Sequence, residues 1–138
     1  MLHLLDAMPR DLHISIRNDL PEGVTSVTDG LRNVWVRKGL TAVSERCAIV
    51  HELVHIRYGH TEKQPRRIER RVREETARTL LGLDDLHRAW SWSLSVPEMA
   101  DELRVTETVL ADRLDTLTHH EAHTLRSWTH ATLGIIGA

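Results

Sequence analysis

Residues 41–60 read TAVSERCAIVHELVHIRYGH, and this stretch predicts one long helix. Its apolar residues recur at steps of three and four, the spacing that gathers side chains on one face of a helix. That stripe consists of Val43, Cys47, Val50 and Val54. Thr41 or Ser44 can cap the start of the helix, and Gly59 is suited to end it. We therefore expect a helix over residues 42–58 with one face packed into a core.

The middle of this stretch carries two histidines four positions apart, His51 and His55, with Glu52 directly after the first. Histidines at this spacing lie one above the other on a helix, so both imidazoles can reach one tetrahedral cation such as Zn²⁺. Glu52 can then reach a water at the open coordination position and take its proton. The pattern predicts a hydrolytic zinc site. The alternative is that two histidines face solvent by chance.

A hydrolytic zinc site usually has three protein ligands, so a third ligand has to be found. His60 follows His55 by five positions, not by the six of the pattern HExxHxxGxxH, and we expect it at the helix end or on the substrate side. A second long helix is predicted over residues 68–81, because its apolar residues again recur at helical spacing and Gly82 follows. This helix offers three glutamates as candidates: Glu69, Glu74 and Glu75.

Helical spacing separates these three glutamates. The face most suited to burial is made of Val72, Thr76 and Leu80. Glu69 precedes these residues by three, seven and eleven positions, so it shares their face. Glu74 lies among arginines on a solvated side, and Glu75 is intermediate. We predict Glu69 as the third metal ligand and keep Glu75 as the alternative.

The residues before the long helix predict a small sheet. Residues 12–17 alternate apolar and polar side chains, and residues 24–28 are rich in β-branched ones. Asp29 and Gly30 form a strong hairpin signal ahead of a third strand over residues 31–37. With a short helix over residues 1–8, the expected fold class is α+β, with a three-stranded antiparallel sheet packed on the two helices.

The last third predicts a small helical module. Residues 96–106, with Val109 and Leu114, fit a helix-turn-helix frame in which Thr106 caps the second helix. Residues 95–138 contain three arginines against seven acidic residues, whereas phosphate contacts supply most non-specific affinity for DNA. We expect a packing or partner-docking module rather than a DNA-binding one. The predicted division is a core over residues 1–94 and a module over residues 95–138.

Composition limits the other classes of protein. With 138 residues, 41% hydrophobic and 28% charged, the chain fits one globular domain or a domain with a small appendage. A single cysteine, Cys47, excludes an intrachain disulfide and an all-cysteine zinc site, while ten histidines draw attention to metal or proton chemistry. The first eight residues do not resemble an export signal, and no apolar run is long enough to span a bilayer. The expected compartment is the cytoplasm, with no membrane association.

These motifs resemble the ImmA/IrrE family of metallopeptidases. The similar features are HELVH at residues 51–55 followed by Gly59 and His60, and a second helix that starts at Glu69 and continues with Val72 and Thr76, where the family commonly has alanines. The resemblance covers roughly residues 12–81. It implies a minimal zincin-like core in which His51, His55 and Glu69 bind Zn²⁺ and Glu52 is the base, followed by a helical segment.

The resemblance also implies a narrow protease. Such proteins resemble the anti-repressors of phages and mobile elements, which cleave or otherwise inactivate a helix-turn-helix repressor whose gene usually lies next door. The expected function is therefore zinc-dependent, site-specific cleavage of a protein partner of that kind. Two rival hypotheses remain. One is a non-catalytic regulator that sequesters a repressor or sensor protein, and the other is a DNA-binding transcription factor with a decayed protease fold.

Overall fold

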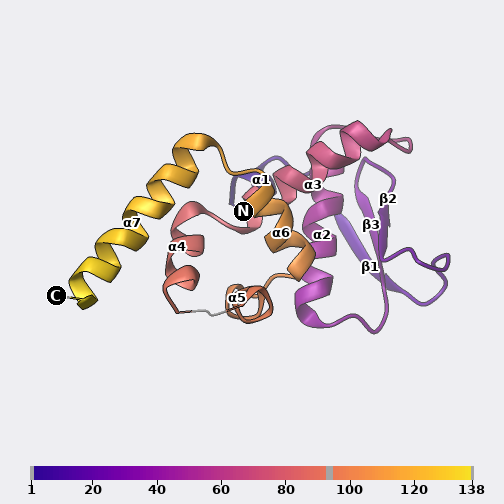
Figure 1. Ribbon diagram of the computed structural model, residues 1–138. Helices are drawn as coiled ribbons and strands as arrows, with labels where there is room; N and C mark the ends of the chain where they lie inside the picture. The colour runs from indigo at the N-terminus through magenta and orange to yellow at the C-terminus, as the bar shows by residue number, and fades with distance from the viewer. Residues whose placement is uncertain (1, 93–94, 138) are drawn as a thin grey trace. The chain divides into compact units, whose positions relative to one another are not determined.

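Residues 2–92 and 95–137 are described by the structure, a computed structural model. Contacts within the chain divide it into two compact units, Met1–Leu80 and Leu81–Ala138 (Figure 1). In chain order the first unit contains α1 (Leu2–Asp6), β1 (His13–Arg17), β2 (Ser26–Thr28), β3 (Asn33–Arg37), α2 (Ala42–Arg57) and α3 (Arg66–Leu80). The second contains α4 (Leu83–Trp92), α5 (Val96–Leu103), α6 (Glu107–Asp115) and α7 (His119–Gly137). The class is α+β, as the sequence predicts.

The sheet is mixed, with strand order β1-β3-β2. Strand β2 pairs with β3 antiparallel through the predicted turn at Asp29 and Gly30. Strand β1 pairs with β3 in parallel, with Ile14 beside Val34. The prediction of an all-antiparallel sheet is therefore wrong for β1. The short connection of residues 29–32 fixes the antiparallel direction of β2 against β3, whereas no tight turn joins β1 to either strand, and β1 pairs with the other side of β3.

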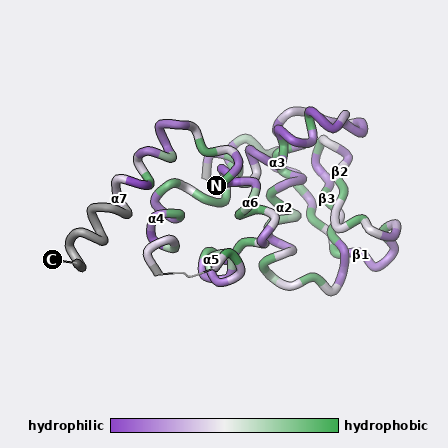
Figure 2. Tube along the Cα trace, in the orientation of Figure 1, coloured by the Kyte–Doolittle hydropathy of each residue, from purple (hydrophilic) through white to green (hydrophobic). Residues whose placement is uncertain are grey.

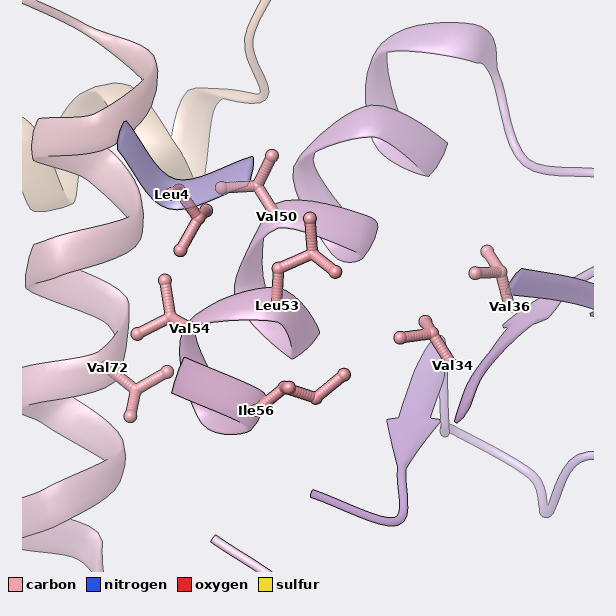
Figure 3. Close-up of a cluster of buried hydrophobic side chains, with 8 residues drawn as sticks. All are labelled: Leu4, Val34, Val36, Val50, Leu53, Val54, Ile56 and Val72. Atoms are coloured by element: carbon pink, nitrogen blue, oxygen red, sulfur yellow. The ribbon is translucent and has the colours of Figure 1, made fainter. Parts of the chain in front are cut away.

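One face of the sheet packs on α2, and the core of the first unit lies there. Val34 and Val36 are fully buried on β3, and they face Val50, Leu53 and Val54 on α2 (Figure 3). Val72 adds the contribution of α3, whose exposed faces are strongly hydrophilic (Figure 2). Burial of such side chains contributes about 1.5–3 kcal/mol each relative to leaving them exposed. This packing holds α2 between the sheet and α3.

Helix α2 begins and ends at the residues that the sequence indicates. The hydroxyl of Thr41 accepts a hydrogen bond from the N–H of Ser44 at 3.1 Å, and this N-cap fixes the first turn. Gly59 has a φ of +65°, and the N–H of His60 donates to the carbonyl of His55 at 3.0 Å. Together with the bond from Gly59 N–H to the carbonyl of Ile56, this is a Schellman motif. The predicted helix is confirmed, and its end folds the chain back over its last turn.

The second unit consists of α4 to α7. Thr106 caps α6, as the sequence predicts, Ser95 caps α5, and Arg104 follows α5 in a left-handed conformation. Helix α4 packs on α5 and α7. The division into domains at residue 94 that the sequence suggests stays a prediction. Within the described part of the chain, the helices are all too short or too polar to cross a membrane.

Candidate metal centre

Two consecutive turns of α2 bring His51, Glu52 and His55 together. Each of the three side chains offers one ligand atom, and these atoms lie within 4.8 Å of one another. The imidazole rings of His51 and His55 have their centroids 5.0 Å apart. Among the described residues, no other cluster of histidine, cysteine and acidic side chains is this tight. The structure thus brings together the three residues of the predicted motif.

Glu69 reaches the same place from α3. Its Oε1 atom lies 3.0 Å from Nε2 of His55, and its Oε2 atom lies 3.4 Å from Nε2 of His51. One carboxylate therefore faces both imidazoles. The expected face of α3 is present, because Val72 and Thr76 are buried and Glu69 shares their side of the helix.

Glu75, the alternative ligand, lies elsewhere. Its Oε1 atom accepts a hydrogen bond from Arg57 at 3.1 Å. The hydroxyl of Tyr58 also donates to Glu75, and this hydrogen bond raises the pKa of Tyr58. Arg57 and Tyr58 thus contact the carboxylate of Glu75, whereas the carboxylate of Glu69 lies against both imidazoles.

Glu52 is the buried carboxylate of the group, with 6% of its surface exposed. Burial raises the pKa of Glu52, while a hydrogen bond from Ser26 and the charge of His51 act against that increase. The hydroxyl of Ser26 donates to Oε2 of Glu52 at 2.7 Å. Sequence reasoning missed Ser26, because the strand pattern shows that β2 exists but not which of its side chains meets α2. The carboxyl group of Glu52 therefore holds its proton more readily than an exposed glutamate does.

His55 is held on both ring nitrogens. Its Nε2 atom faces Glu69, and its Nδ1 atom lies 3.0 Å from Nδ1 of His60. Burial lowers the pKa of His55, and the electrostatic interactions with His51 and His60 lower it further, whereas the carboxylate of Glu69 acts in the opposite direction. A histidine binds a metal with its neutral imidazole, and a lowered pKa keeps His55 in that form. His60 is placed at the helix end, as expected.

A cavity of about 450 Å³ opens over this group. Strand β2 lines one part of it with Ser26, Val27 and Thr28, and residues 60–64 line another. His51, Glu52, His55 and Glu69 also belong to the lining. Because the ligand candidates border a cavity of this size, a substrate group can reach them.

The donor set fits a zinc ion. Ligand atoms at 2.0–2.1 Å from a tetrahedral cation are separated from one another by roughly 3.3 Å. Oε1 of Glu69 lies 3.0 Å from Nε2 of His55 and Oε2 lies 3.4 Å from Nε2 of His51, so each imidazole has one carboxylate oxygen of Glu69 near that separation. Two imidazoles and a carboxylate suit zinc better than the all-oxygen preference of calcium or magnesium.

Apart from His60, the other histidines whose side chains the structure describes lie outside the group. His119, His120 and His123 lie at the start of α7 and are exposed. His87 lies on α4, where its ring meets Trp128 edge to face and its Nε2 atom has no hydrogen-bond partner among the described residues. Comparison of the chain with family models, with curated proteins and with solved structures found no match.

Proposed function

We propose that this protein is a zinc-dependent peptidase. The observation that carries the proposal is the convergence of the Nε2 atoms of His51 and His55 on the carboxylate of Glu69, with buried Glu52 next to them. Hydrolytic zinc sites have three protein ligands and leave the fourth position to water, whereas structural zinc sites have four protein ligands. The adjoining cavity gives a substrate access to that position.

Each residue then has a chemical part. Zn²⁺ bound by His51, His55 and Glu69 would polarise the scissile carbonyl and lower the pKa of a water molecule. Glu52 takes the proton of the attacking water and delivers it to the leaving amine. Ser26 holds one oxygen of Glu52, Oε2, and this leaves Oε1 for the proton. The raised pKa of Glu52 matches this role, since the carboxyl group has to accept a proton and give it up again.

The shape of the site favours an extended peptide as substrate. Strand β2 is an edge strand, because it pairs with β3 on one side only. Its residues also line the cavity. An edge strand can add an extended segment through main-chain hydrogen bonds. A substrate segment that lies along β2 would pass beside Ser26 and Glu52. We infer that the substrate is a protein with an extended or unfolded cleavage site.

The partner we propose is a helix-turn-helix repressor, which the protein cleaves in the cytoplasm. This step rests on the resemblance of residues 51–60 and of the helix that starts at Glu69 to the ImmA/IrrE family. We propose that the second unit docks the partner rather than DNA. Arg113, the only basic residue of α6, supports this view because it is 2% exposed and donates to Leu81 and Glu121.

The proposal is tested with purified protein and the repressor encoded next to its gene. Metal analysis is expected to find about one zinc per chain, and His51→Ala is expected to lose it. Glu52→Gln keeps the shape of the side chain and is expected to retain zinc while cleavage falls by about 10²–10⁴-fold. Absence of bound metal in the wild type would contradict the proposal. A Glu52→Gln variant that still inactivates the repressor would favour sequestration instead.

A further inference from the structure

The second nitrogen of His55 has an unusual partner. Histidines that bind metals usually donate the N–H of their other ring nitrogen to a carboxylate, a carbonyl or a water. Here the atom within hydrogen-bond distance of His55 Nδ1 is Nδ1 of another histidine, His60, at 3.0 Å. The two rings meet nearly edge to face, with centroids 5.2 Å apart and planes at 65°.

The positions of the hydrogens follow from the chemistry of imidazole. When Nε2 of His55 binds a cation, its lone pair is used, so the ring hydrogen of His55 sits on Nδ1. That hydrogen points at Nδ1 of His60, which must then be the acceptor and carry its own ring hydrogen on Nε2. The pair therefore fixes both the tautomer and the orientation of His55.

His60 is held in place from three directions. The Schellman motif at Gly59 ties the N–H of His60 to the carbonyl of His55 at 3.0 Å. The ring of His60 stacks on Tyr58, with centroids 5.8 Å apart and planes at 25°. The turn between β2 and β3 abuts its backbone, since a Cβ atom built on Gly30 would lie 2.1 Å from the carbonyl oxygen of His60. A side chain placed by a helix end, a ring and a neighbouring turn is preorganised rather than incidental.

We propose that His60 is a positioning residue that accepts the Nδ1 hydrogen of His55 and thereby orients this imidazole toward the metal. The inference rests on the metal site of the proposed function. His60 acts through His55 and is not itself a metal ligand. Loss of such a partner typically costs about 10–100-fold in metal affinity.

The test uses two variants of the full-length protein that have nearly the same shape. His60→Asn places an amide oxygen where Nδ1 stands and keeps an acceptor, whereas His60→Leu has methyl groups there and has none. Zinc affinity is measured by competition with a chromophoric chelator. We expect His60→Leu to bind zinc about 10–100-fold more weakly and His60→Asn to recover most of the affinity. The visible absorption of bound Co²⁺ should shift in His60→Leu and stay close to wild type in His60→Asn.

Two controls separate positioning from folding. Urea unfolding of the metal-free variants should give similar midpoints, because His60 is only half-buried. Tyr58→Phe keeps the ring beside His60, removes the hydroxyl that contacts Glu75, and should leave zinc affinity unchanged. Equal affinity in His60→Leu and the wild type would overturn the inference, as would equal losses in the Leu and Asn variants. A wild type that binds no zinc would instead overturn the proposed function.

Discussion

At the scale of single residues, the site depends on which acidic side chain faces the two imidazoles. Spacing along α3 favours Glu69, since it shares a face with Val72 and Thr76, and the structure shows both of these residues buried. Glu75 is instead engaged by Arg57 and Tyr58. Helical periodicity is enough for this choice because a rigid helix converts spacing into direction. It cannot supply Ser26 or the His55–His60 pair, which depend on how separate elements meet.

The proposed ligand role of Glu69 gives a prediction with a matched control. Glu69→Ala removes the carboxylate that lies 3.0 Å from His55 and 3.4 Å from His51, and we expect it to abolish tight zinc binding. Glu75→Ala makes the same chemical change six positions later on the same helix, and we expect it to bind zinc like the wild type. Isothermal titration with ZnCl₂ measures both. If Glu75→Ala lost zinc and Glu69→Ala did not, the assignment would have to be reversed.

At the scale of elements, helix α2 and the β2–β3 hairpin could be predicted from local signals, but the direction of β1 could not. The caps of α2 are encoded at Thr41 and Gly59, and the hairpin at Asp29 and Gly30. Strand β1 has no such signal, because its partner β3 lies far along the chain and no tight turn joins them. Its alternation shows that it is a strand, and the packing of the whole sheet then determines its neighbour.

In the turn between β2 and β3, Gly30 lies very close to the backbone of His60, and this contact can be tested. Gly30 has a φ of +75°, and a Cβ atom there would lie 2.1 Å from the carbonyl oxygen of His60. Gly23 has a similar φ of +79° but no atom within 4 Å of a Cβ, so it serves as the control. Gly23→Ala should lower the free energy of unfolding in urea by about 1–3 kcal/mol, the cost of placing a residue with a side chain in a left-handed conformation. Gly30→Ala should lower the free energy of unfolding by more than that, because its Cβ would also clash with the backbone of His60. It should also weaken zinc binding by displacing His60. Equal losses would show that the turn does not support the site.

The same turn gives a pH dependence. Although partial burial raises the pKa of Asp29, hydrogen bonds from the N–H groups of Asn33, Arg32 and Leu31 and from the side chain of Asn33 lower it well below its usual value. A lowered pKa stabilises the fold above the pKa of the unfolded aspartate, near 4, and this stabilisation is lost as the pH falls toward the folded value. Asp29→Asn removes the charge, so it should destabilise the protein at pH 7, and the difference from the wild type should shrink progressively as the pH falls below about 4. A difference in unfolding free energy that stayed constant with pH would contradict this account.

At the scale of the whole molecule, all the residues of the candidate site belong to the first unit. The buried cluster that supports α2 runs from Leu4 to Val72, and Glu69 lies within the same unit, which ends at Leu80. Helix α4 packs instead on α5 and α7 in the second unit. Sequence periodicity cannot say with which neighbours α4 packs, since an amphipathic helix can cover any apolar surface. The boundary after residue 94 that the sequence favours therefore differs by one helix from the division by contacts.

Two fragments of the chain distinguish these boundaries. A fragment of residues 1–80 retains the cluster and the site, so we expect it to unfold cooperatively in urea and to bind zinc as the full chain does. A domain of this size is marginal on its own, and zinc at 100 times its dissociation constant would add about 2.7 kcal/mol to its stability. A fragment of residues 1–94 adds α4 without α5 and α7, which exposes Leu86 and Ala89, both fully buried in the full chain. That fragment should bind a hydrophobic dye such as ANS more strongly than the shorter one. If the shorter fragment were unfolded with zinc while the longer one folded, α4 would belong to the core and the boundary at residue 94 would be the correct one.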